Sequence, residues 1–257
     1  MSQYVIRTNG TDDAAARPCP VLYKPDDPKY GESIRKFQGC PTIAVTRGGR
    51  IYAGWYSGGT KEPHIDNYNL VVVSDDGGKT FDKSPLLVIP SSRERLVQAL
   101  DIQMWTAPDG RLFMLMRTST GHPAWSVSSD VGRTWSDPKH LRDSTGRAYL
   151  QPRSPCPIYD YNGCESGSGV YFAMIHDTFD FEKKNTAYQN RGPVYIIWGE
   201  YDPNGEQPIK FTEKRMLNPR TISWNSYYTS YTVVNGERIL WYPDGKHYLL
   251  GKIITRP

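Results

Sequence analysis

Short apolar stretches, some alternating with polar residues and some continuous, run along the whole chain and are separated by turn residues. Residues 41–57 and 102–119 show the arrangement clearly, because each reads as an apolar run, a turn containing glycine and a second apolar run. Two strand-like runs joined by such a turn are typical of a β-hairpin. No stretch shows the 3.6-residue period of a long amphipathic helix, so the pattern predicts an all-β fold.

A sequence repeat follows each of these two hairpins. Residues 74–81 (SDDGGKTF) and 128–135 (SSDVGRTW) both read Ser-x-Asp-x-Gly-x-Thr-aromatic. Each segment comes after a strand-like run and precedes another extended stretch. The hairpin and the strands around the repeat add up to four antiparallel strands in about 50 residues, which is the size of a propeller blade.

The residue types of the repeat suit a tight turn. The aspartate can accept backbone N–H groups within the turn, and the glycine can supply a positive φ. The aromatic residue can then pack back between neighbouring sheets. In the two copies these positions are Asp76 and Asp130, Gly78 and Gly132, and Phe81 and Trp135.

The second half of the chain continues the rhythm without the turn motif. Four strand-like runs lie within residues 154–217 and three more within residues 228–255. The strand that the last set lacks can come from residues 3–8, which would pair the two ends of the chain and remove a sheet edge. The sequence therefore predicts a single β-propeller domain over residues 1–257, with blades at about 36–90, 101–142, 153–218 and 227–257, closed by strand 3–8.

Composition supports strands and turns and argues against two classes of partner. The chain has 18 Tyr and 7 Trp, which favour strands, and 23 Gly and 20 Pro, which favour turns. The net charge of +4 is spread without a basic run, so nucleic acid is not expected as a partner. No apolar run is long enough to span a bilayer, so no membrane is expected either. The first residues lack a secretory-signal pattern, which favours the cytoplasm.

The four cysteines, Cys19, Cys40, Cys156 and Cys164, form no C-x-x-C pair. Three of them precede proline, and we expect reduced thiols packed at strand starts rather than a disulfide or a metal site. No His/Asp cluster shows ligand spacing, so the sequence predicts neither a metal nor another cofactor.

The paired turn motif resembles the Asp box, or BNR repeat, of the sialidase (neuraminidase) superfamily. Residues 191–211 and 228–253 also look like bacterial sialidase-like proteins, and the resemblance covers most of residues 35–255. It implies a sialidase-like β-propeller of four-stranded antiparallel blades, of which about four to five are visible here against the usual six. Asp boxes lie away from the active site in that family, so the motif residues are expected to be structural.

The resemblance also implies a set of catalytic residues. Sialidases use a Tyr nucleophile, an Asp acid/base and a Glu partner for the tyrosine. The acid/base is expected in the loop after the second strand of the first blade, where Asp66 is the first choice and Glu62 the second, with His64 as a substrate-binding residue beside them. Tyr228 matches the nucleophile, and Glu165 is the candidate for its partner.

Three arginines hold the substrate carboxylate in sialidases, because the planar guanidinium can bond a carboxylate at two points. The position of the first of these reads Phe-Gln-Gly-Cys-Pro (37–41) here, and Arg35 lies nearby but out of register. Arg117, Arg153 and Arg191 are the other candidates for binding substrate. A surface or salt-bridge role is the alternative for each.

Two functions remain open at this point. The first is a glycoside hydrolase that cleaves a terminal sugar, acidic sugars included. The second is a carbohydrate-binding or scaffold propeller without catalysis. Both predict a glycan or glycoside as the partner, and neither indicates an oligomeric state.

Overall fold

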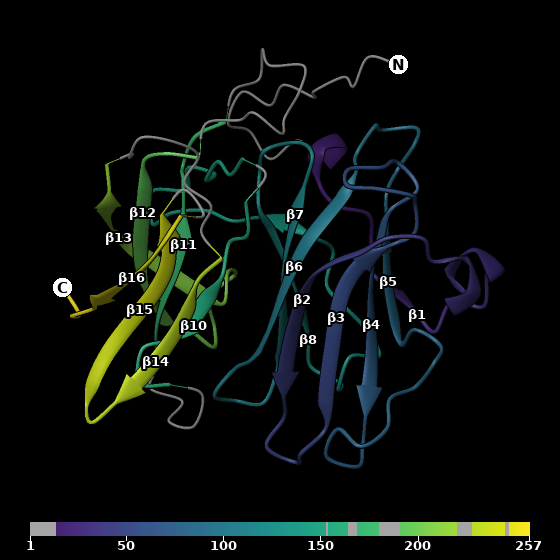
Figure 1. Cartoon of the computed structure of the whole chain (residues 1–257), viewed down its shortest axis with the longest axis horizontal. Helices are drawn as coiled ribbons and strands as arrows, with labels where there is room; N and C mark the ends of the chain where they lie inside the picture. Colours follow the sequence, from purple (N-terminus) through teal and green to yellow (C-terminus); the bar gives the residue numbers. More distant parts are fainter. Residues whose placement is uncertain (1–13, 153, 164–168, 180–190, 220–227, 245–246) are drawn as a thin grey trace. The chain divides into compact units, whose positions relative to one another are not determined.

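The computed structural model describes residues 14–152, 154–163, 169–179, 191–219, 228–244 and 247–257 (Figure 1). The chain divides into two units, Met1–Leu141 and Arg142–Pro257. Each unit holds two antiparallel sheets, and the only helices in the described ranges are short 3-10 turns. The predicted all-β fold class is confirmed.

The first sheet of the first unit has five strands in the order β1-β5-β4-β3-β2, all antiparallel. Its outermost strand β1 is preceded by the 3-10 turn η1, and the turns η2 and η3 lie between β1 and β2 in the chain. The bounds are η1 Ala14–Ala16, β1 Leu22–Tyr23, η2 Pro28–Tyr30, η3 Glu32–Ile34, β2 Gln38–Val45, β3 Ile51–Ser57, β4 Tyr68–Ser74 and β5 Leu87–Pro90.

The other three sheets are also meanders of consecutive strands. The second sheet of the first unit is β6 Ala99–Thr106, β7 Leu112–Thr118, β8 Ala124–Ser128 and β9 Lys139–His140. The second unit holds β10 Ile158–Asp160, β11 Val170–Ile175, β12 Val194–Tyr201 and β13 Ile209–Asn218, and a three-stranded sheet of β14 Ser230–Val234, β15 Glu237–Asp244 and β16 Tyr248–Ile253. Four-stranded meanders of this kind are the blades of β-propellers.

The predicted closure by residues 3–8 falls outside the described residues. The first described strand, β1, instead extends the first sheet by pairing with β5. The single-domain assignment stays a prediction.

Apolar faces of neighbouring strands form the core of each unit. In the first unit, Tyr52, Val71 and Met114 are fully buried in a cluster of apolar side chains from both sheets. In the second unit, Phe172 and Leu240 are fully buried in a corresponding cluster. Each buried side chain of this size stabilises its unit by about 1.5–3 kcal/mol. The continuous apolar run of β4 is buried along its whole length, which explains why it does not alternate.

The two repeated turns have the hydrogen bonds that their sequence predicts. The Ser74 hydroxyl donates to Asp76 Oδ1 (2.7 Å), which also accepts the backbone N–H of Thr80 (2.9 Å). The Ser128 hydroxyl donates to Asp130 Oδ1 (2.8 Å), which accepts the N–H of Thr134 (2.8 Å). In each turn, hydrogen bonds from the threonine lower the pKa of the aspartate to about 2. As predicted, φ is positive at both turn glycines, +86° at position 78 and +84° at position 132.

The aromatic residues of the two turns differ, and the prediction for Phe81 is wrong. Trp135 packs against the core of the first unit and donates its indole N–H to the Gly132 carbonyl (3.1 Å). Phe81 is 40% exposed. The second turn rests on the first sheet, because the Tyr52 hydroxyl donates to the Val131 carbonyl (2.9 Å). No described residue of the first unit gives the first turn such an anchor.

Candidate active site

One strand in each sheet of the first unit has a β-bulge. β2 has a register shift between Gly39 and Thr42, and β6 has one between Ala99 and Ile102. The two strands are neighbours, and the Met104 N–H donates to the Thr42 hydroxyl across them (3.0 Å). β-bulges re-aim side chains and are frequent next to active sites. The residues inside the two bulges are therefore candidates for a functional site.

Cys40 lies inside the β2 bulge with φ at +48°, in the left-handed region. A residue other than glycine adopts this conformation only where its surroundings impose it, and such positions are enriched at functional sites. Burial raises the pKa of the Cys40 thiol, and the neighbouring carboxylates of Asp101 and Glu62 raise it further. The thiol therefore stays protonated near neutral pH and is a weak hydrogen-bond donor, not a thiolate nucleophile.

Asp101 lies inside the β6 bulge and forms a buried ion pair with Arg117 of β7. The two side chains are 4% and 2% exposed, and Arg117 Nε lies 3.0 Å from Asp101 Oδ2. The second oxygen, Oδ1, is buried and has no hydrogen-bond partner in the described part of the chain. Native proteins rarely leave a buried polar atom unpaired, and such an atom is a natural point of contact for a ligand.

Tyr56 and Glu62 complete the group. Tyr56 of β3 is fully buried, and its hydroxyl has no hydrogen-bond partner within the described ranges. Glycine is required at position 39, since a Cβ there would lie 2.8 Å from this hydroxyl. Burial raises the pKa of Tyr56, and the nearby Glu62 carboxylate adds to the effect. Glu62 itself is exposed on the loop between β3 and β4.

We call these five residues the inner-strand cluster: Cys40, Tyr56, Glu62, Asp101 and Arg117. It contains two carboxylates, one guanidinium, one thiol and one phenol, gathered from two sheets of one unit. Paired carboxylates are the usual means of general acid–base catalysis at a glycosidic bond. Among the described residues, no group of three or more His, Cys, Asp or Glu side chains is placed to hold a metal ion.

The structure separates the two acid/base candidates of the loop. Asp66 is 50% exposed and forms an ion pair with Arg93. His64 Nδ1 lies 3.6 Å from Asp66 Oδ2 and accepts the Asp66 backbone N–H (3.2 Å). Arg35 donates to the carbonyl of Tyr30 (3.0 Å) and so supports the segment of η2 and η3. Of the residues predicted for the first unit, the inner-strand cluster contains only Glu62 and Arg117.

The other predicted site residues belong to the second unit. Arg191 is half-buried and precedes β12, and Tyr228 is 49% exposed and precedes β14. Glu165 and Arg153 lie outside the described residues. Their predicted roles stay predictions.

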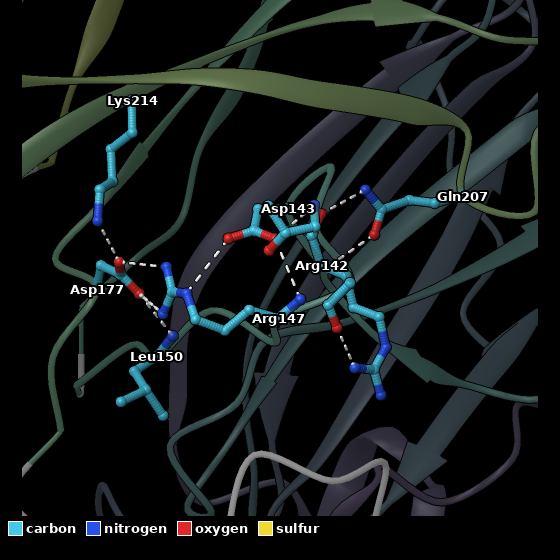
Figure 2. A network of polar contacts seen from close by, with 9 residues as sticks. Arg142, Asp143, Arg147, Leu150, Asp177, Gln207 and Lys214 are labelled. Carbon is cyan, nitrogen blue, oxygen red and sulfur yellow. Dashed lines mark hydrogen bonds and ion pairs between the residues drawn. The ribbon is translucent and has the colours of Figure 1, made fainter.

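The second unit contains a charged network that the sequence did not indicate (Figure 2). Asp177, whose side chain is 4% exposed, receives two bonds from Arg147 (3.1 and 2.7 Å) and one from Lys214 (2.6 Å). Its carboxylate also accepts the Leu150 N–H (3.3 Å). Burial acts to raise the pKa of Asp177, but Arg147 and Lys214 outweigh it and hold that pKa below its usual value. With four donors on one carboxylate, this network ties the segment before β10 to β13 and is structural.

Sequence reasoning missed Cys40, Tyr56 and Asp101 as members of one site. One signal was available, since Asp101 is the only charged residue in the run VQALDIQMW. A carboxylate inside a buried strand requires a partner, and such positions are frequently functional. Cys40 and Tyr56 carried no comparable signal, because their proximity depends on the bulge in β2.

Comparison with solved structures shows which proteins this chain resembles in fold. The K499G mutant of NanB sialidase from Streptococcus pneumoniae matches with a TM-score of 0.54 at 18% identity, over 77% of this chain and 26% of that one. An exo-1,5-α-L-arabinanase from a bovine ruminal metagenomic library matches with a TM-score of 0.52 at 11% identity, over 89% of this chain and 77% of that one. This chain thus spans about a quarter of the length of the sialidase that it matches.

No protein-family model and no curated protein matches the sequence. The fold class is therefore defined by structure, and it is an all-β protein built from propeller blades. In fold the chain is similar to the sialidase and to the arabinanase, which confirms the sialidase-like fold that the sequence resemblance predicted. No helix in the described ranges is long and apolar enough to cross a membrane.

Proposed function

We propose that this chain is a sialidase-like glycoside hydrolase that removes a terminal sugar, with the inner-strand cluster as its active site. The observation that carries the proposal is the buried carboxylate of Asp101, which has one oxygen on Arg117 and the other without a partner among the described residues. A second carboxylate, Glu62, lies beside the same group of side chains. The glycoside hydrolases among the structural neighbours support this chemistry through the shared fold.

The two carboxylates suit different roles. Glu62 is exposed on its loop and can exchange protons with water, so it serves as the general acid/base that protonates the leaving oxygen. Asp101 is fixed by Arg117 and faces the positive charge that develops on the sugar ring. We choose Glu62 over Asp66 because Glu62 lies beside Cys40 and Tyr56. Tyr228 is not a member of the inner-strand cluster, and its role as the nucleophile stays a prediction of the sequence resemblance.

A sugar-binding propeller without catalysis is the second candidate. The environment of Arg117 favours this second candidate. The Arg117 guanidinium is buried against Asp101 and forms an ion pair with it. Arg35 is likewise committed to the backbone of Tyr30. Neither arginine is therefore available as a primary contact for a substrate carboxylate. Both candidates have a glycan as the partner, and the cytoplasmic location is proposed with them.

The test is turnover on fluorogenic glycosides that include sialosides, arabinofuranosides, rhamnosides, glucuronides and common neutral sugars. We expect one class to be cleaved, and we expect Glu62→Gln and Asp101→Asn to reduce kcat/KM by about 10²- to 10⁴-fold. Tyr228→Phe should abolish turnover if Tyr228 is the nucleophile. Glu94→Gln is the matched control, because Glu94 is an exposed carboxylate of the same unit.

Circular dichroism and thermal melting of each variant distinguish lost chemistry from lost folding. A folded wild-type protein that cleaves none of the glycosides would contradict the hydrolase and leave the binding propeller. In that case a glycan array would identify the ligand.

A further inference from the structure

A cavity of about 350 Å³ lies in the first unit, and none of the residues that line it belongs to the inner-strand cluster. Its walls come from the loop between β3 and β4, the end of β5 and the segment of η2 and η3, which lies at the β1 side of the sheet (Figure 1). The volume is at the lower end of the range of small-molecule sites, which is ~300–1,000 Å³. All of its lining residues lie in one unit.

The floor of the cavity is aromatic and contains an unused polar atom. Tyr30 and Tyr68 are each 4% exposed, and their rings meet edge to face with centroids 4.9 Å apart. The hydroxyl of Tyr68 is buried and forms no hydrogen bond of normal length and angle with a described residue, although the Arg35 guanidinium lies near enough to act on its pKa. A buried hydroxyl next to a cavity gains a partner when a ligand with hydroxyl groups enters. Aromatic rings and a hydrogen-bonding group together are suited to binding a sugar ring.

The walls are held in place before any ligand arrives. Asn67 accepts the Gly59 N–H (2.9 Å) and donates to the Lys61 carbonyl (3.2 Å). The Ser91 hydroxyl donates to the Asn67 carbonyl and accepts the Ala99 N–H (2.8 Å). These bonds fix the loop on one side of the cavity, and a preformed site loses less free energy to ordering on binding.

The charged residues of the lining favour an anion. The lining contains two cations, Lys29 and Arg93, and one carboxylate, Asp66. The Arg93–Asp66 pair is 68% and 50% exposed, and Lys29 pairs with Asp27 at 61% and 44% exposure. Exposed pairs contribute little free energy, so either cation can exchange its partner for a ligand carboxylate at small cost.

We propose that this cavity binds a hydroxylated carboxylate the size of one sugar ring, of the uronic acid class, at a site separate from the inner-strand cluster. The Tyr68 hydroxyl bonds a ring hydroxyl, the tyrosine rings contact the ring carbons, and Arg93 with Lys29 holds the carboxylate. This binding does not depend on catalysis at the inner-strand cluster. The two proposals therefore fail independently.

The test is isothermal titration of the whole chain with D-glucuronate and D-galacturonate, each compared with the neutral parent sugar. We expect saturable binding of one uronate with a dissociation constant of about 1 mM or below, and at least tenfold weaker binding of its neutral parent. Tyr68→Phe should weaken uronate binding about tenfold and leave the thermal midpoint unchanged, because the lost hydroxyl has no bond in the described protein. Arg93→Gln should reduce the affinity for the uronate to that for the neutral sugar.

Arg50→Gln is the control matched in charge, because Arg50 also pairs with an exposed aspartate, Asp75, elsewhere on the first sheet. It should bind like the wild type. The proposal is overturned if neither uronate binds saturably, if the neutral sugars bind equally well, or if Tyr68→Phe and Arg93→Gln keep wild-type affinity. A lowered thermal midpoint for Tyr68→Phe would also overturn it, since the hydroxyl would then serve the fold. Glu62→Gln should keep full uronate binding whatever its effect on turnover.

Discussion

Asp101 combines a role in the fold with the chemical role that we propose for it. Its carboxylate is in a buried strand, where an unpaired charge would be costly, and Arg117 supplies the compensating charge. Only one of its two oxygens is used in this pair. The pair therefore stabilises the fold and leaves an acceptor facing the inner-strand cluster.

Removal of Arg117 tests the structural half of this role. Arg117→Gln should lower the free energy of unfolding by about 3–5 kcal/mol, because it leaves Asp101 buried without its counter-charge. The double variant Arg117→Gln/Asp101→Asn should recover part of that loss. Urea unfolding of the single and double variants gives the coupling energy, and additive effects would show that the two residues do not act as a pair.

At the scale of elements, the two repeated turns show that equal sequences need not have equal surroundings. Their internal hydrogen bonds match, yet only the second turn is tied to another sheet, through Tyr52 and Trp135. The first turn lacks that anchor in the described part of the unit, and Phe81 is correspondingly exposed. Local sequence fixes the turn, and the neighbouring sheet decides what its aromatic residue contacts.

Tyr52→Phe tests the link between the second turn and the first sheet. The change should lower the free energy of unfolding by about 1 kcal/mol, because it removes the bond to the Val131 carbonyl and leaves the packing intact. Tyr68→Phe provides the comparison, since the same deletion there removes no described bond and should cost nothing. Equal costs for the two variants in urea unfolding would contradict this account.

The Asp177 network connects several elements of the second unit and predicts a pH dependence. In the folded state the pKa of Asp177 is below its ordinary value of 3.8. The contribution of Asp177 to stability is therefore present above pH 3.8 and is lost as the pH falls through the pKa of the folded state. Asp177→Asn should therefore be less stable than the wild type at pH 7 and lose less stability on acidification. Thermal midpoints across this pH range test it, with the exposed Glu237→Gln as the control. Parallel acid profiles for Asp177→Asn and the wild type would contradict the expectation.

At the level of the whole molecule, the class of fold can be predicted from the amino-acid sequence alone. Hairpin signals at residues 41–57 and 102–119, together with the repeated turn, predicted strands and an all-β fold class that the structure confirms. These features are local, since alternation, glycine at a positive φ and a side chain that closes its own turn act over a few residues. The resemblance to sialidases rests on the same local features.

Which side chains lie close together depends on the tertiary structure. Glu62 and Asp66 are four residues apart on one loop, yet one lies beside Tyr56 and the other lines a separate cavity. Cys40 and Asp101 meet because two bulges occupy the same place in neighbouring strands. A bulge reverses which face a side chain occupies, and contacts between distant segments depend on how sheets pack. Neither effect is contained in the local pattern from which the strands were predicted.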